Sequence, residues 1–243
     1  MPAPIAGTRI VFTPLPAAHF GAGTIGALPG IVRGTGSTAV VLITDEALAG
    51  TPVVAAATAA LAGGGRTTAV FAGVRANPTT EDVAAGAAEV AALAAGGTAV
   101  TVVAVGGGSV LDAAKGIALA AVNPERGRAL DYRGTFARAA LPLVAVPTTA
   151  GTGAETNSFG VVTDVQAGSK FYVGHASTRP AAAILDPDLT LGLPPAVTAA
   201  TGMDALTHAL ESYLSRRWWA RRPAAARRGR TCRGSRGHGP AAG

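Results

Sequence analysis

Short runs of apolar, β-branched residues alternate along this chain with segments of helical character. Strands are predicted at residues 39–44, 67–71, 99–105 and 141–146, and those at 39–44 and 99–105 read as buried. Helices are predicted between them, at residues 53–61, 80–95 and 110–122. Such alternation indicates a parallel sheet that is covered by helices on both faces. We therefore predict an α/β fold built on a parallel sheet.

A change of pattern after residue 185 predicts a second domain. Prolines punctuate the next segment, and residues 198–215 then read as a helix with no further strand after it. We predict an α/β domain at residues 1–185, the beginning of an incomplete all-α domain at 186–215, and an arginine-rich tail at 216–243.

The net charge of +6 is concentrated in this tail. Residues 216–243 contain nine arginines and no acidic residue, which leaves 11 basic against 14 acidic residues in the remaining chain. Arg, Gly, Ala and Pro dominate the tail, as they do when GC-rich coding DNA is read out of frame. We hypothesise a frameshift near residue 216. The alternative is an arginine tail that binds nucleic acid or an anionic membrane, but nothing in the rest of the chain supports such a partner.

The cysteine content and the hydropathy pattern favour a cytoplasmic protein. Cys232 is the single cysteine, which excludes a disulfide within the chain. Charged residues interrupt every apolar stretch well short of a bilayer span, and the N-terminus does not resemble a secretory signal.

Two glycine-rich loops compete as phosphate-binding sites. Residues 21–26, GAGTIG, formally match the dinucleotide fingerprint, but Pro14 and Pro16 just before them argue against a central strand there. Residues 106–109, GGGS, follow a clear strand and open a clear helix, so their amides point where a pyrophosphate would bind. We favour the second loop.

Three residues near these loops have simpler interpretations beside the functional ones. Ser109 and Asp112 are spaced to form a capping box, which is compatible with phosphate binding. Asp45, at the end of a predicted strand, is placed to accept hydrogen bonds from ribose hydroxyls and to disfavour a 2′-phosphate. Its alternative is an ordinary carboxylate in solvent.

Several longer motifs follow one another along the chain. They are FGAGT (20–24), NPTTEDV (77–83), GGGSVLDAAKGIAL (106–119), VPTTAGTGAETNSFGVVTD (146–164), LDPDLTLGLP (185–194) and TAATGMDALTHALESYLS (198–215). In this order and spacing, the chain resembles the iron-containing (group III) alcohol dehydrogenase family. The combination of GGGSxxDxAK, PTTAGTGxE and GMDALTHxxE is very specific.

The resemblance implies an N-terminal dinucleotide-binding domain, a C-terminal helical domain and an active site in the cleft between them. It also implies a set of cofactor contacts: Asp45, Gly106, Gly107, Gly108, Ser109, Thr148, Thr149, Thr152 and Lys170. For Lys170 the alternative of an ordinary surface lysine stays open, because its surroundings match the family loosely.

Asp204 and His208 are candidate metal ligands. Their i, i+4 spacing places a carboxylate and an imidazole on one face of a helix, although such a pair is also common as a simple hydrogen bond. The resemblance implies that they bind Fe²⁺, with Zn²⁺ as the alternative. The family adds two histidines further along, whereas His19, His175 and His238 match no ligand motif. The metal site is therefore predicted to be half complete.

Together, these features predict a metal-dependent, NAD-linked alcohol dehydrogenase, with NADP as the alternative cofactor and a small alcohol or aldehyde as substrate. The resemblance implies a homo-oligomer for the full-length family and a C-terminal truncation of this chain. Two alternatives stay open: a metal-free enzyme like maleylacetate reductase, and a catalytically inactive remnant that retains at most dinucleotide binding.

Overall fold

The computed structural model describes residues 16–214, so the arginine-rich tail, Cys232 and His238 lie outside the described residues. Within this range six strands form a parallel sheet in the order β1-β8-β5-β4-β2-β3. These strands are β1 (Ala17–Phe20), β2 (Ala39–Asp45), β3 (Thr67–Val74), β4 (Val100–Gly106), β5 (Leu143–Pro147) and β8 (Ala182–Leu185). An antiparallel hairpin of β6 (Phe159–Asp164) and β7 (Ser169–Gly174) forms a second, separate sheet.

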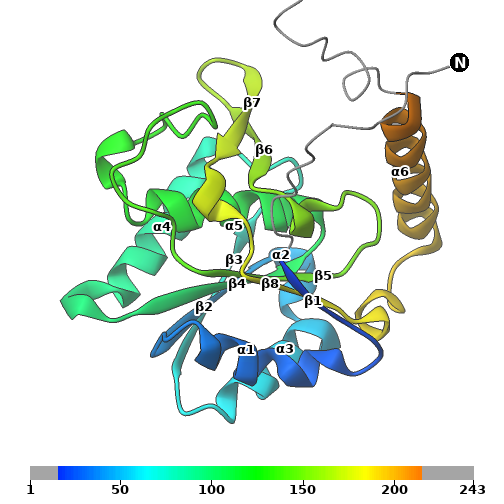
Figure 1. The fold of residues 1–243 in the computed structure, drawn as a ribbon, viewed down its shortest axis with the longest axis horizontal. Coiled ribbons are helices and arrows are strands. Elements are labelled where there is room, and N and C mark those ends of the chain that lie inside the picture. The colour runs from blue at the N-terminus through cyan, green and yellow to red at the C-terminus, as the bar shows by residue number, and fades with distance from the viewer. Residues whose placement is uncertain (1–15, 215–243) are drawn as a thin grey trace, which may run out of the picture. The chain divides into compact units, whose positions relative to one another are not determined.

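Helices cover both faces of the parallel sheet, as predicted. In Figure 1, α1 (Leu28–Gly34) and α3 (Pro52–Ala62) lie on one side, and α4 (Thr80–Leu93) and α5 (Gly108–Ala120) lie on the other. The short α2 (Glu46–Ala49) follows β2 directly. Single turns of 3-10 helix are η1 (Thr24–Ala27), η2 (Ala95–Gly97), η3 (Pro124–Arg126), η4 (Ala154–Thr156), η5 (Ala176–Thr178) and η6 (Pro187–Thr190).

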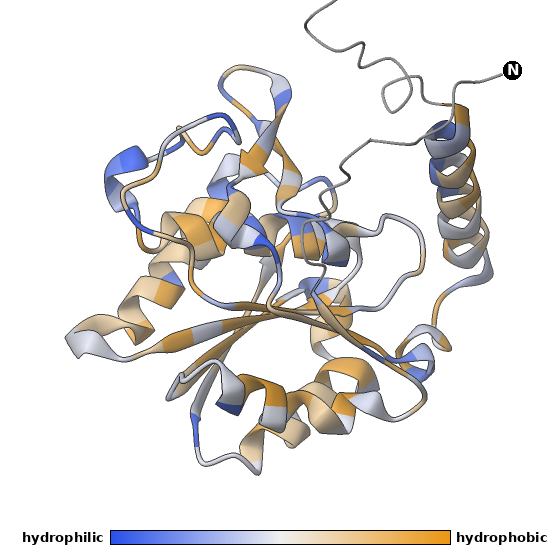
Figure 2. Cartoon of the chain, in the orientation of Figure 1, coloured by the Kyte–Doolittle hydropathy of each residue, from blue (hydrophilic) through white to orange (hydrophobic). Residues whose placement is uncertain are grey.

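The central strands are apolar on both sides, which explains their continuous β-branched runs. Along β2, Val41 and Ile43 pack into the cluster under α4 and α5, while Val40 and Leu42 pack into the cluster under α1 and α3. All four side chains have no exposed surface. Figure 2 shows the same arrangement as hydrophobic colour along the strands and on the sheet-facing helices. Each such side chain contributes about 1.5–3 kcal/mol by burial.

The sequence did not predict strands β1, β6, β7 and β8. β1 was not predicted because prolines precede it, yet it is an edge strand, where proline is tolerated. β8 is short and alanine-rich, so it has no strong β signal. The β6–β7 hairpin, which lies between β5 and β8 in the chain, was not predicted either.

The described chain divides at residue 205 into two compact units. The last helix, α6 (Pro195–Leu214), begins in the first unit and ends in the second, and none of its residues is buried. A long final helix fits the beginning of an all-α domain, as predicted, while the predicted boundary at residue 185 remains a prediction. No helix within residues 16–214 is both long enough and apolar enough to cross a membrane.

Candidate functional site

The strand order reverses between β2 and β4. From β2 the chain continues to β3 on one side, whereas from β4 it continues to β5 on the other. In open parallel sheets, ligands bind outside the carboxyl ends of the strands at such a switch point. Asp45 ends β2 and Gly106 ends β4, so the topology alone brings these two predicted contacts to the same place.

The turn at residues 106–109 has the features of an anion site. Gly107 is the N-cap of α5, and Gly108 and Ser109 form its first turn. Amides of a first helical turn have no intrahelical acceptor, and the helix dipole favours an anion there. A Cβ atom on Gly108 would lie 2.6 Å from Thr152 Cγ2, so only glycine allows this close approach.

The capping box proposed for Ser109 and Asp112 is wrong. Gly107 caps α5 without any side-chain hydrogen bond. Ser109 Oγ accepts a hydrogen bond from the amide of Asn77 at 3.3 Å. Asp112 Oδ2 accepts one from the amide of Val161 at 2.9 Å. The acidic side chain is engaged by the β6–β7 hairpin, a contact that spacing within the helix does not reveal.

Three threonines lie next to the glycine turn at residues 106–109. Thr148 is buried directly after β5, and its amide donates to the Gly106 carbonyl oxygen at 3.0 Å. Thr149 packs beside Gly107, where a Cβ atom would lie 3.4 Å from Thr149 Cγ2. Thr152 packs against Gly108 in the same way. The threonines of the PTTAGTG segment therefore lie next to the glycine turn. We refer to Thr148, Thr149 and Thr152 as the threonine wall.

Lys170 is linked to the glycine turn through Asn77, a residue that was not among the predicted cofactor contacts. Its Nζ donates to Asn77 Oδ1 at 2.8 Å, and the Asn77 amide in turn donates to Ser109 Oγ. Asn77 has a φ of 55°, which asparagine tolerates better than most residues. In the sequence, an Asn-Pro dipeptide indicates only a turn. It follows β3, however, and so lies at the carboxyl edge of the sheet.

Asp45 has a structural partner as well as a functional position. Its Oδ1 accepts a hydrogen bond from the Leu48 amide at 2.9 Å and so caps α2. The side chain is half-buried rather than an ordinary carboxylate in solvent. An N-cap carboxylate keeps a fixed orientation at the end of β2, where the switch point lies.

The competing loop at residues 21–26 is satisfied by the protein itself. The carboxylate of Asp186 accepts hydrogen bonds from Gly23 N at 3.1 Å and from Ile25 N at 2.9 Å. The amides that a phosphate would need are thus already bound to an anion. The loop also follows an edge strand, β1, away from the switch point.

Asp204 and His208 both lie on α6, so the i, i+4 spacing falls on a helix as expected. Residues 16–214 contain no group of three or more His, Cys, Asp or Glu side chains that could hold a metal ion. Gly151 lies close to the first half of α6: a Cβ atom on it would lie 3.2 Å from Asp204 Oδ2. The pair supplies two donors of types that bind Fe²⁺ or Zn²⁺, fewer than a catalytic site uses.

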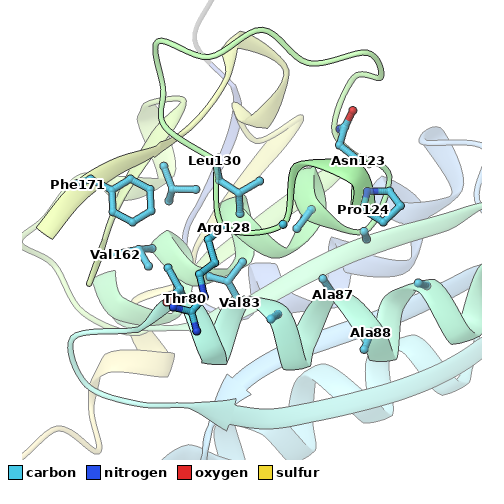
Figure 3. A pocket seen from close by; sticks show the side chains of 16 residues that line it. Thr80, Val83, Ala87, Ala88, Asn123, Pro124, Arg128, Leu130, Val162 and Phe171 are labelled. Carbon is cyan, nitrogen blue, oxygen red and sulfur yellow. The ribbon is translucent and has the colours of Figure 1, made fainter. Parts of the chain in front are cut away.

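An apolar cavity of about 330 Å³ lies elsewhere, between α4, the end of α5 and the β6–β7 hairpin. Val83 and Ala87 of α4 line it together with Leu130 (Figure 3). Its larger polar side chains are bonded within the protein, Asn123 to Leu119 and Arg138, and Arg128 to Glu81. None of the predicted cofactor contacts lines this cavity.

Comparison with known proteins settles the family. The sequence profile of the iron-containing alcohol dehydrogenases matches residues 16–187. The chain belongs to the iron-containing alcohol dehydrogenase family. The matched range includes the glycine turn, the three threonines and the hairpin.

Several individual oxidoreductases are also similar to this chain. Lactaldehyde reductase of Escherichia coli (strain K12) is 38% identical over 205 residues, which are 84% of this chain and 53% of that protein. The structure of 1,3-propanediol oxidoreductase superposes with a TM-score of 0.74 at 34% identity, over 85% of this chain and 53% of that one. Sulfoacetaldehyde reductase from Bifidobacterium kashiwanohense, solved in complex with NAD+, gives a TM-score of 0.75 at 31% identity, over 86% and 55%. The chain spans about half the length of these relatives.

Proposed function

We propose that this chain provides the dinucleotide site of an NAD-linked, metal-dependent oxidoreductase that interconverts small alcohols and aldehydes. The reaction moves a hydride between the alcohol carbon and the nicotinamide ring, and the alcohol hydroxyl gives up its proton. NADP is the alternative cofactor. The proposal rests on one observation: Asp45 and the glycine turn both lie at the switch point of the sheet, with the threonine wall next to the turn.

Each predicted contact has a role in this proposal. The amides of Gly107, Gly108 and Ser109 hold the pyrophosphate at the N-terminus of α5. Asp45 accepts hydrogen bonds from the adenosine ribose and repels a 2′-phosphate. The remaining contacts orient the cofactor from the opposite wall, and they are Thr148, Thr149, Thr152 and Lys170.

We further propose that Asp204 and His208 are two ligands of a divalent ion, Fe²⁺ with Zn²⁺ as the alternative. A bound ion would lower the pKa of the alcohol hydroxyl and, in the reverse direction, polarise the carbonyl. The contribution of this chain is to hold the ion on one face of α6. Two protein ligands bind a divalent ion more weakly than the three of a catalytic zinc site.

The first prediction tests cofactor binding and preference through Asp45. Asp45→Ser keeps an oxygen that can cap α2 and removes the charge. We expect the affinity for NADH, measured by fluorescence titration, to fall at least about tenfold, because a charge-assisted hydrogen bond contributes roughly 1.5–3 kcal/mol. The preference for NADH over NADPH should narrow, because the repulsion of the 2′-phosphate is lost.

Asp164→Ser is the matched control. Asp164 also accepts backbone hydrogen bonds in a turn, from Gln166 and Ala167, but it is not one of the predicted contacts. Its replacement should leave both affinities unchanged. Wild-type protein that does not bind NADH would overturn the proposed function. Unchanged NADH affinity in Asp45→Ser would remove the role of this carboxylate.

A second candidate function is a dinucleotide-binding module without catalysis. The observation in its favour is the absence of a three-ligand metal group within residues 16–214. The two candidates differ in metal content and in reduction of NAD by short alcohols in the presence of Fe²⁺ or Zn²⁺. NADH binding without metal uptake or turnover favours the module. Turnover that Asp204→Ala abolishes favours the dehydrogenase.

A further inference from the structure

Lys115 is a charged side chain with no exposed surface. Its Nζ donates hydrogen bonds of 2.7 Å to three acceptors, which are the carbonyl oxygens of Ala154 and Phe159 and Oδ1 of Asn157. All three acceptors belong to the short segment that follows Thr152. One ammonium group therefore holds the segment that continues the threonine wall.

The three acceptors match the chemistry of a primary ammonium. Such a group has three donors and no acceptor, and here all three donors are used. An arginine would present a planar fork, which does not match three converging acceptors. The chain uses arginine 18 times and lysine only twice. Both lysines, Lys115 and Lys170, contact residues of the candidate site or its supporting segment.

A second charged side chain holds the other side of the same segment. Asp112 lies one turn before Lys115 on α5 and accepts the Val161 amide. Its Oδ1 lies 3.9 Å from Lys115 Nζ. Between the two anchor points, Gly160 lies so close to α5 that a Cβ atom would be 2.7 Å from Asp112 Cα. Residues 154–161, which include the beginning of the hairpin, are thus held against α5.

We propose that Lys115 is a positioning residue for the dinucleotide. The helix that it belongs to begins with the glycine turn, so the turn and the anchored segment are fixed to one rigid element. By holding residues 154–159 in place, Lys115 fixes the distance between the threonine wall and the position proposed for the pyrophosphate. This inference rests on the proposed dinucleotide function and adds a residue that does not itself contact the cofactor.

The electrostatics show that the charged form of Lys115 is costly to bury. Burial lowers the pKa of Lys115 to about 8, and the nearby carboxylates of Asp112 and Glu155 counteract this only in part. An ammonium group is costly to bury unless it is fully bonded. Its removal would take one donor from each of the three acceptors, and of these Asn157 Oδ1 would keep the hydrogen bond from the Phe159 amide. The loss of these bonds should loosen this segment first.

The experiment compares Lys115→Met with Asn123→Ala in the full chain. Asn123 is the matched control because it is also fully buried and also holds a distant segment, through hydrogen bonds to Arg138. Urea unfolding measures the stability of each variant. Titrations with NADH and with AMP, whose ribose would lie at Asp45, measure binding to the whole site and to its adenosine side.

We expect both variants to lose stability. Lys115→Met should weaken NADH binding at least tenfold and change AMP binding less than twofold, whereas Asn123→Ala should leave both affinities unchanged. If Lys115→Met does not fold, Asn157→Ala replaces it, because this variant removes one acceptor and leaves the lysine in place. For Asn157→Ala we expect NADH binding to weaken about threefold, with AMP binding again unchanged.

The outcomes separate this inference from the proposed function. Wild-type protein that binds no NADH overturns the proposed function and the inference with it. Wild-type protein that binds NADH, together with Lys115→Met that binds it equally well, overturns the inference alone. Equal losses of NADH and AMP affinity, or the same loss in Asn123→Ala, would reduce Lys115 to a general structural role and also overturn it.

Discussion

At the scale of single residues, the groups proposed to contact a cofactor are held in place by side chains from distant parts of the sequence. The glycine turn, the threonines, Asp45 and Lys170 occur in recognisable motifs. Asn77 and Lys115 act through partners tens of residues away in the sequence, as the contact between Lys115 and Asn157 shows. Spacing along a helix reports neighbours three or four residues apart and nothing of such contacts.

The buried charge of Lys115 predicts how stability depends on pH. In the folded protein Lys115 loses its proton near pH 8, whereas in the unfolded chain it does so near its ordinary pKa of 10.5. Between these values the unfolded chain holds more protons, so the free energy of unfolding should increase with pH. The contribution of Lys115 is fully present above pH 10.5 and is lost as the pH falls through 8. Its full extent is about 3 kcal/mol.

Urea unfolding of the wild type and of Lys115→Met at several pH values between 7 and 10.5 measures this contribution. The difference between the two proteins should change in favour of the wild type as the pH rises. Asn123→Ala should show no such change relative to the wild type, since no lysine is removed. A difference that stays constant over this range would contradict the prediction.

At the scale of elements, the sequence predicted the central strands and their helices well. Their signal is local: continuous apolar runs for β2 and β4, and acidic first turns such as that of α4, where Thr79 and Asp82 form a capping box. The β6–β7 hairpin was missed because its alternation is short and interrupted by Gly160. The beginning of α5 was misplaced by two residues, because Gly107 rather than Ser109 is its N-cap.

The loop at residues 21–26 yields a prediction about Asp186. Asp186→Ala removes the acceptor for the amides of Gly23, Ile25 and Asp188. We expect the free energy of unfolding to fall by at least about 2 kcal/mol, since a hydrogen bond to a charged group contributes roughly 1.5–3 kcal/mol. NADH affinity should change less than twofold, because the loop serves the fold and not the phosphates.

Urea unfolding and the NADH titration decide this together. Asp188→Ala, in which the backbone amide that donates to Asp186 is retained, is the control and should behave as the wild type in both measurements. A strong loss of NADH affinity in Asp186→Ala at modest loss of stability would return residues 21–26 to the list of phosphate loops.

At the scale of the whole molecule, the family and the α/β architecture were predicted from motifs that occur together in one chain. The domain boundary could not be fixed in the same way, because proline punctuation after residue 185 marks a change of pattern and not a change of packing. The metal site is the least complete part of the prediction, since the ligands proposed within residues 16–214 are a single pair.

The end of α6 predicts self-association of the chain. Leu206, Leu210 and Leu214 lie on one face of this helix and are 51%, 52% and 71% exposed. Contiguous apolar surface of this kind promotes association or aggregation. We expect Leu206→Glu combined with Leu210→Glu to lower the apparent mass in sedimentation velocity and the binding of a hydrophobic dye. Glu211→Gln is the control, and equal masses for all three proteins would contradict the prediction.

The contrast between the two lysines has a practical consequence for following this protein in solution. Lys170 is open to solvent and Lys115 is sealed beneath the hairpin. An amine-directed acylating reagent would modify Lys170 quickly. It would modify Lys115 only when the hairpin separates transiently from α5. The ratio of the two labelling rates, measured by peptide mass spectrometry, therefore reports how often the hairpin separates from α5, and Lys170 serves as the internal reference.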